Sequence, residues 1–168
     1  MKKYIDFDGV IMDTYMPLFH DYLEKKNNGI YVDDTKHVIN KNWEDVIKNS
    51  FVINDAINII KELETDNVAI LTRIHSLENE GVAKIKFLRE MGIKCNIILV
   101  PYQVKKTDIV QAKNNILVDD AVFNLDEWRM AGGIPIFFDT RGNNIDGFGV
   151  ENKNYIKTRS LNILKRYE

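Results

Sequence analysis

The sequence predicts an α/β fold in which a parallel β-sheet lies between two layers of helices. Short apolar runs rich in Ile and Val alternate along the chain with segments that have helical spacing, a pattern typical of parallel sheets. These runs show no polar alternation, as expected for strands that are buried on both faces. Five runs are expected to be strands: residues 3–7, 68–71, 96–100, 116–118 and 134–138.

The segments between these runs are expected to be helices that connect neighbouring parallel strands by right-handed crossovers. Gly92 is placed to end one helix in the left-handed conformation, and Gly132-Gly133 to end another. The expected helices span residues 54–64, 76–91, 107–112 and 121–130.

Residues 14–50 interrupt this alternation, because two helical patterns at 16–26 and 42–48 follow each other without a strand between them. Asn27-Asn28-Gly29 and Asp33-Asp34 are expected to be turns. The segment is too short for a core of its own. We therefore predict a small helical cap (residues 14–50) inserted into a core formed by residues 1–13 and 51–168, in which 141–153 are loop and 158–167 a last helix.

The composition indicates an ordinary globular protein, with 45% hydrophobic and 29% charged residues among 168. No apolar run approaches the roughly 20 residues of a membrane helix or forms a signal peptide, so a cytoplasmic protein without a membrane partner is expected. A net charge of −2 argues against binding duplex nucleic acid. The single cysteine, Cys95, is expected to be a buried packing residue. The oligomeric state stays open.

Polar residues end three of the apolar runs, and together with a lysine between two runs they suit phosphoryl chemistry. Asp6 and Asp8 follow the first run, Thr72 the second and Asp119 the fourth, while Lys106 precedes a helical pattern. The carboxyl ends of parallel strands share one edge of a sheet, so these side chains are expected to meet there. Carboxylates are ligands for a hard divalent cation, and an ammonium and a hydroxyl can bind phosphoryl oxygens.

These residues resemble the four motifs of the haloacid dehalogenase superfamily of phosphohydrolases, in the same order. The first motif is similar to IDFDGV at 5–10, the second to AILT at 69–72, and the fourth to ILVDD at 116–120. The third motif is a lysine at a helix start, matched by Lys106 or Lys105. The resemblance implies a Rossmann-like core, a Mg²⁺ cofactor and hydrolysis of a phosphomonoester.

By this resemblance Asp6 is the nucleophile that forms an aspartyl-phosphate, which divides one displacement into two easier ones. Asp8 then serves as the general acid and base. Asp6, Asp8 through its backbone carbonyl, and Asp119 are the expected Mg²⁺ ligands. Asp120 is expected to support the metal shell or the lysine. An acid at position 8 also favours phosphatase over dehalogenase chemistry.

Four residues are expected to bind the substrate phosphate or its neighbourhood: Thr72, Arg73, Lys105 and Lys106. Lys106 is preferred to Lys105 because Thr107-Asp108 directly after it could begin a helix. Lys105 remains an alternative. The histidines are expected outside the chemistry, with His20 and His37 facing solvent, and His75 exposed or capping a helix. Packing is favoured over pocket lining for the aromatic and methionine positions Tyr15, Met16, Phe19 and Trp43.

A similarity to the cytosolic 5′(3′)-deoxyribonucleotidases suggests a nucleotide as the small phosphorylated substrate, with a sugar phosphate or another small phosphometabolite as the alternative. Two other classes compete with an enzyme. A phosphate-sensing, receiver-like module also combines Asp, Thr and Lys on a parallel sheet, but it places its phosphorylated Asp on a middle strand and its Lys last. A family member without catalysis would keep the fold for binding only.

Overall fold

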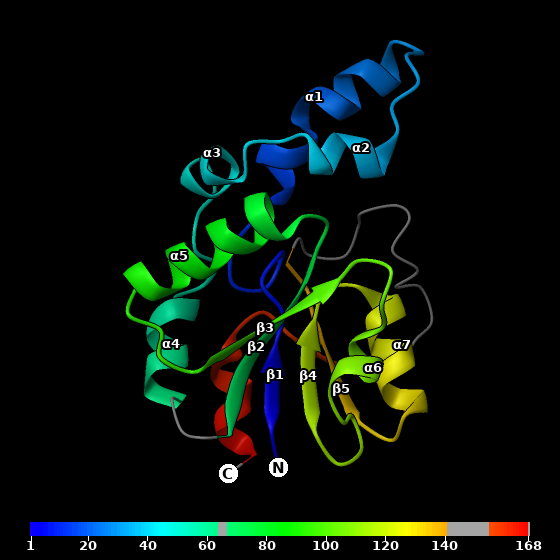
Figure 1. Ribbon diagram of the computed structural model, residues 1–168. Coiled ribbons are helices and arrows are strands. Elements are labelled where there is room, and N and C mark those ends of the chain that lie inside the picture. The colour runs from blue at the N-terminus through cyan, green and yellow to red at the C-terminus, as the bar shows by residue number, and fades with distance from the viewer. Residues whose placement is uncertain (64–66, 141–154, 168) are drawn as a thin grey trace.

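The computed structural model describes residues 1–63, 67–140 and 155–167, and it confirms the predicted α/β fold (Figure 1). Six strands form one sheet in which every pair is parallel, in the order β3-β2-β1-β4-β5-β6. The strands are β1 (Lys3–Ile5), β2 (Val68–Ile74), β3 (Asn96–Pro101), β4 (Ile116–Asp119), β5 (Ile134–Phe138) and β6 (Ile156–Thr158).

Alternate residues along strands β1 to β5 belong to two different cores, one on each face of the sheet. Ile5 and Ile70 lie in one core, whereas their neighbours Tyr4 and Leu71 lie in the other. Because both faces are covered, no polar alternation was needed along these strands. This explains why the strands read as continuous apolar runs.

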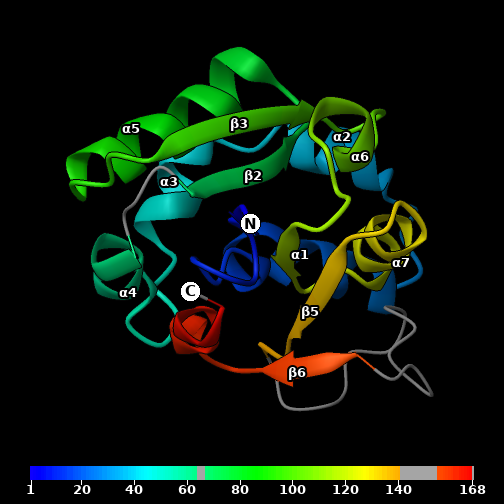
Figure 2. The same ribbon diagram turned by 90° about the horizontal axis from the view of Figure 1, so that it is seen from below.

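Helices cover both faces of the sheet, which gives three layers (Figure 2). One layer contains α4 (Ala56–Leu63), α5 (Val82–Glu90) and the 3₁₀ helix η2 (Leu161–Arg166). The other contains α6 (Lys106–Ile109) and α7 (Val122–Met130). A π turn, η1 (Leu77–Gly81), leads directly into α5.

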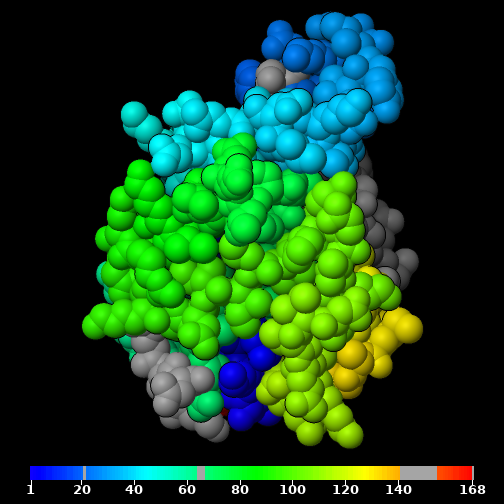
Figure 3. All heavy atoms as spheres, viewed as in Figure 1, coloured from blue at the N-terminus to red at the C-terminus, as the bar shows by residue number. Residues whose placement is uncertain are grey.

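The cap consists of three helices that stand at the carboxyl ends of the strands (Figure 1). They are α1 (Tyr15–Asn27), α2 (Asp34–Ile39) and α3 (Trp43–Lys48). Helix α3 packs on α5, and its Trp43 is buried in the core. The space-filling view shows residues of α1 and α2 projecting beyond the body of the molecule (Figure 3).

Two predictions in the cap and the tail are wrong. Asp33-Asp34 does not form a turn between helices, because the Asp33 carboxylate accepts from Lys36 N at 2.9 Å and thereby begins α2. The predicted last helix at 158–167 is shorter and of 3₁₀ type, and Thr158 ends the sixth strand, β6, which the sequence did not predict. The predicted loop at 141–153 lies outside the described residues.

Three helix starts also differ from their predictions. Helix α4 begins at Ala56 because Asn54 and Asp55 have φ of +42° and +62°, which a right-handed helix excludes. The segment from Ser76 begins as a π turn before it becomes α5. Helix α6 begins at Lys106 itself, with Lys105 as its N-cap residue.

Cys95 is half-buried against the core and not fully buried as predicted. Among residues 1–63, 67–140 and 155–167, no helix combines the length and apolarity that crossing a membrane would require.

Candidate active site

Three adjacent strands bring the predicted polar residues to one edge of the sheet. Asp119 ends β4, Asp6 directly follows β1, and Thr72 lies near the end of β2. Strand β1 pairs with both others, and Asp6 N continues the pairing by donating to Val118 O at 3.0 Å. Thr72 and Asp119 are fully buried and Asp6 is 7% exposed. The predicted convergence at the carboxyl edge is therefore present.

Lys106 joins the two acidic strand ends. Its Nζ donates to Asp6 Oδ1 at 2.8 Å and to Asp119 Oδ2 at 2.6 Å. Burial of Lys106 favours the neutral amine, but the charges of Asp119 and Asp6 outweigh it and raise the pKa of the lysine above its ordinary value. The ammonium is thus charged and oriented before any ligand arrives.

Asn124 on α7 is a neighbour of Asp119 that the sequence did not predict. Its Nδ2 donates to Asp119 Oδ2 at 3.0 Å, and its Oδ1 accepts from Arg73 Nε at 3.1 Å. The other oxygen of Asp119 accepts from Ala121 N at 2.9 Å. The signal available in the sequence was a polar residue on the buried face of α7, one turn after Asp120.

Asp6, Asp119 and Asp120 form an acidic cluster in which one carboxylate oxygen of each lies within 4.8 Å of the others. Burial is the main cause that raises the pKa of Asp6 to about 7; Lys106 opposes it, and the charges of Asp119 and Asp8 add to it. The pKa of Asp120 is raised well above its ordinary value by burial and then by Asp119, Asp6 and Asp8. The cluster thus offers more carboxyl oxygens than Lys106 binds, and such oxygens are the ligands that a hard divalent cation prefers.

Gly9 allows the Asp-x-Asp turn to pass close to this cluster. Its φ is +72°, and a Cβ at this position would stand 2.1 Å from Asp120 Oδ2. Gly9 N donates to Met12 O at 2.8 Å. Only glycine fits both the left-handed backbone and the adjoining carboxylate.

Asp8 lies apart from this grouping. Its Oδ1 accepts from Thr14 Oγ1 at 2.8 Å, and its Oδ2 accepts from Lys84 Nζ at 2.5 Å. Among the described residues, the side chain that joins Asp6 and Asp119 in the acidic cluster is therefore Asp120, and not Asp8. Coordination through the Asp8 backbone carbonyl stays a prediction.

Lys84 is the second residue that sequence reasoning missed. It is fully buried on α5, between Glu80 one turn before and Leu88 one turn after. Burial favours its neutral form, but Asp8 and Glu80 outweigh it and raise its pKa. Its place on the same helix face as the buried Leu88 was the available signal.

The remaining predicted phosphate ligands lie in different surroundings. The Thr72 hydroxyl makes a long 3.3 Å hydrogen bond to Arg73 O and accepts from Lys84 Nζ at 3.2 Å. Arg73 is braced by Tyr102 O at 2.8 Å and by Asn124. Lys105 is exposed and lies 3.8 Å from a Glu127 oxygen, away from the contacts that Lys106 makes.

Packing explains several of the histidine and aromatic positions. Trp43 is buried, whereas Met16 is exposed. His20 faces solvent as predicted, but His37 does not, because its ring stacks on Phe19 and its Nε2 lies 2.5 Å from Leu18 O. Tyr15 and Phe19 contact each other on α1, with ring centroids 5.0 Å apart. His75 is half-buried and stacks on Tyr102 with ring centroids 4.8 Å apart.

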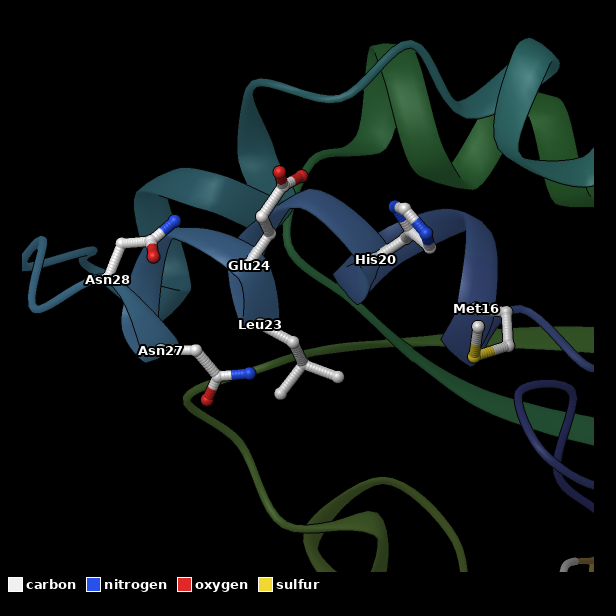
Figure 4. A pocket seen from close by; sticks show the side chains of 6 residues that line it. All are labelled: Met16, His20, Leu23, Glu24, Asn27 and Asn28. Atoms are coloured by element: carbon white, nitrogen blue, oxygen red, sulfur yellow. The ribbon is translucent and has the colours of Figure 1, made fainter.

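The cap also carries an open groove of about 580 Å³ along helix α1 (Figure 4). The helix begins beside the site, because its N-cap residue Thr14 binds Asp8. At 1.5 Å per residue the groove extends about 16 Å along the helix axis. Its lining residues come from successive turns of α1 and the residue that follows it: Met16, His20, Leu23, Glu24, Asn27 and Asn28.

No protein-family model matches the chain, and no curated protein matches it in sequence. Solved structures do match over nearly the whole chain. A haloacid dehalogenase-like family hydrolase from Streptococcus pneumoniae is 14% identical with a TM-score of 0.59, covering 99% of this chain and 98% of that one. A haloacid dehalogenase (HAD) hydrolase from Bacillus subtilis, described as bound to magnesium, is 14% identical with a TM-score of 0.59, covering 99% of this chain and 97% of that one.

A HAD hydrolase of family IA, variant 3, from Entamoeba histolytica is 16% identical with a TM-score of 0.62, covering 96% of this chain and 94% of that one. At these identities the likeness concerns the fold. The chain therefore has the haloacid dehalogenase fold, as its motifs predicted.

Proposed function

We propose that this protein is a Mg²⁺-dependent phosphomonoester hydrolase that works through an aspartyl-phosphate on Asp6. The carrying observation is the contact of Lys106 with both Asp6 and Asp119, at 2.8 and 2.6 Å, inside a buried acidic cluster at the carboxyl edge of the sheet. A charged ammonium aimed into such a cluster is an arrangement that can orient a nucleophile and stabilise phosphoryl oxygens.

In the first step an oxygen of Asp6 attacks phosphorus and the bond to the leaving oxygen breaks. Lys106 holds Oδ1, which orients the carboxylate and leaves Oδ2 for the attack. The leaving oxygen takes its proton from Asp8. In the second step water attacks phosphorus, its proton passes to Asp8, and inorganic phosphate and the Asp6 carboxylate are released.

Mg²⁺ fits the residues present, because the cluster offers three carboxylates against one lysine. Asp6, Asp119 and Asp120 are the side chains that would hold it, with the Asp8 carbonyl as a further predicted ligand. When bound, the ion offsets the repulsion between an anionic nucleophile and an anionic phosphate. Thr72 is proposed to donate its hydroxyl to the phosphate.

For the substrate we propose a small phosphorylated metabolite, with a nucleoside monophosphate as the first candidate and a sugar phosphate as the second. The groove on α1 supports a small organic leaving group, since about 580 Å³ lies in the range of small-molecule sites. Its lining mixes apolar Met16 and Leu23 with amide and imidazole groups and the carboxylate of Glu24.

The receiver-like alternative disagrees with the sheet. A receiver has the strand order 2-1-3-4-5, whereas this chain has β3-β2-β1-β4-β5-β6, and Asp6 follows the first strand. A binding-only protein with this fold remains the competing outcome of the assay.

The decisive assay is the hydrolysis of p-nitrophenyl phosphate with Mg²⁺ and with EDTA. We expect turnover only with the metal, and none above background for Asp6→Asn. The matched control is Asp108→Asn, since Asp108 is an exposed carboxylate on α6. Activity in Asp6→Asn would refute the assigned nucleophile, and an inactive wild type would favour the binding-only protein.

A panel of nucleoside monophosphates, sugar phosphates and phosphoamino acids then tests the substrate class. A nucleotide should give the highest kcat/KM. If sugar phosphates exceed every nucleotide, the nucleotide proposal is wrong while the phosphatase proposal stands.

A further inference from the structure

Lys84 is a buried cation that the proposed chemistry does not use. Its Nζ lies 2.5 Å from Asp8 Oδ2, 2.7 Å from Glu80 Oε1, 3.0 Å from Arg73 O and 3.2 Å from Thr72 Oγ1. An ammonium has three hydrogens, so four acceptors already saturate it. Lys84 is therefore suited to holding protein groups in place and not to receiving a substrate phosphate.

Both oxygens of Asp8 are fixed by this arrangement. Lys84 holds Oδ2, and Thr14, the N-cap residue of α1, donates to Oδ1 at 2.8 Å. The Thr14 side chain makes no N-cap hydrogen bond to its own helix. Threonine commonly caps helices through its side chain, but the Thr14 hydroxyl instead donates to Asp8. Such departures from local preference are expected at functional sites.

The π turn η1 aims Glu80 at Lys84. Glu80 is 1% exposed, and its Oε2 accepts from His75 N at 2.7 Å while its Oε1 accepts from Lys84. Burial opposes ionisation of Glu80, but Lys84 and the hydrogen bonds from His75 outweigh it and lower its pKa. Glu80 therefore holds Lys84 through a buried ion pair one helical turn away.

The cap completes the surroundings of Lys84. The ammonium lies 4.9 Å from the Trp43 ring centroid and 5.3 Å from that of Phe7. Asn79, next to Glu80 in the π turn, accepts from Trp43 N at 3.1 Å and donates to Lys41 O at 2.7 Å. Asn79 and Glu80, consecutive residues of η1, thus bind the start of α3 and Lys84, respectively.

From these contacts we propose that Lys84 is a positioning residue, which holds the Asp8 side chain beside the end of β2, where Asp8 gives a proton to the leaving oxygen and regains one from the hydrolytic water. The inference rests on the proposed function, in which Asp8 is the acid. Within the described residues, none of the polar contacts of Lys84 reaches Asp6 or Asp119, so it acts on the proton-transfer group and not on the nucleophile.

This role predicts a dependence on the leaving group that mere support of the fold would not produce. Phenyl phosphate needs a proton on its leaving oxygen, whereas dinitrophenyl phosphate releases an anion that is stable without one. A residue that acts through the acid should therefore matter for the first substrate and hardly for the second.

The test compares kcat/KM for phenyl phosphate and dinitrophenyl phosphate in wild type, Lys84→Met and Asp8→Asn. We expect Lys84→Met to lose at least about 50-fold on phenyl phosphate and less than about threefold on dinitrophenyl phosphate, the same pattern as Asp8→Asn. Equal losses on both substrates, or no loss on either, would overturn the proposal.

A second variant covers the case in which Lys84→Met does not fold. Lys84→Met combined with Glu80→Gln removes one positive and one negative charge, so it leaves Asp8 as the one carboxylate deprived of its lysine. The folded double variant should keep the preference for dinitrophenyl phosphate. If it treats both substrates as wild type does, the positioning role is wrong; if wild type hydrolyses neither or Asp6→Asn remains active, the proposed function itself has failed.

Discussion

Two buried lysines stand on opposite sides of the same strand ends, and their surroundings differ in charge. Lys106 on α6 faces Asp6 and Asp119, with Asp120 in the same cluster. Lys84 on α5 faces Asp8 and Glu80. The first centre has three acids for one cation, and the pKa values of Asp6 and Asp120 are raised. The second centre has two acids for one cation, and the pKa of Glu80 is lowered.

The difference indicates two kinds of function for one residue type. Around Lys106 the carboxyl groups outnumber the cation, an arrangement that suits the metal ion and the phosphate of the proposed function. Around Lys84 every charge already has partners within the protein, since Glu80 also accepts from His75 and Asp8 from Thr14. A lysine whose acidic partners have all their hydrogen bonds within the protein holds those partners in place. A lysine among a larger number of carboxyl groups leaves some of them available to bind a ligand.

Removing Lys106 should give the largest effect. In Lys106→Met the nucleophile loses its orienting ammonium, and we expect kcat/KM for p-nitrophenyl phosphate to fall at least about 10³-fold. Metal-free stability should also fall, by about 3 kcal/mol, because two buried carboxylates lose their partner. Urea unfolding with and without Mg²⁺ measures this, and saturating Mg²⁺ should restore part of the lost stability. Unchanged turnover would remove Lys106 from the site.

Lys84→Met should destabilise the fold by a similar amount, about 3–5 kcal/mol, because Glu80 is left charged and buried. Saturating Mg²⁺ should stabilise Lys84→Met no more than it stabilises wild type. Adding Glu80→Gln to Lys84→Met should restore part of the lost free energy of unfolding. Both comparisons are made by urea unfolding. If Mg²⁺ restored the stability of Lys84→Met, the two lysine centres would not differ as described.

The raised pKa of Asp6, about 7, makes the stability of the metal-free protein depend on pH. The folded state binds a proton on Asp6 that the unfolded state releases near pH 4, so this stability is present below pH 4 and is lost as pH rises through about 7. Asp120 acts in the same direction. Over this whole interval the loss should be about 4 kcal/mol or less.

Mg²⁺ favours the ionised carboxylates, so it should stabilise more at pH 8 than at pH 5. Thermal unfolding at both pH values, in EDTA and in Mg²⁺, tests this. The lowered pKa of Glu80 acts below this window and does not interfere. Asp6→Asn should flatten the pH dependence; a metal-free protein that gains stability from pH 5 to pH 8 would contradict the assignment.

The smallest effect is expected at Lys105, the sequence neighbour of Lys106 and its matched control. Its exposed side chain lies 3.8 Å from Glu127, and such surface pairs contribute less than about 1 kcal/mol. Lys105→Met should keep stability within about 0.5 kcal/mol and activity within about twofold of wild type. A loss comparable to that of Lys106→Met would mean that the two lysines had been distinguished wrongly.

The sequence predicted the parts of the fold that depend on local pattern. Five strands and the convergence of Asp6, Thr72, Lys106 and Asp119 follow from apolar runs and from the rule that parallel strands end together. Strand β6 has only three residues, two of them exposed, so it carries no apolar run to detect. Helix α2 depends on a single N-cap carboxylate in a segment that also resembles a turn.

The site residues that escaped prediction are those whose role depends on tertiary contact. Lys84 and Asn124 lie inside helices, where a polar residue most often faces solvent, and only packing shows that they meet Asp8 and Asp119. The place of the Asp120 carboxylate within the acidic cluster, where the sequence suggested support of the metal shell or of the lysine, has the same origin. Adjacent carboxylates cannot be ranked by spacing when the turn between strand and helix decides where each one points.

Thr14 has a double attachment with a mechanical consequence. It is the N-cap residue of α1, the first helix of the cap, and its hydroxyl donates to one oxygen of Asp8 while Lys84 donates to the other. Swinging α1 about its root would free the first oxygen and leave the second tethered. If Asp8 is the acid proposed above, a movement of α1 at Thr14 would change both the access of a substrate to the site and the mobility of the acid.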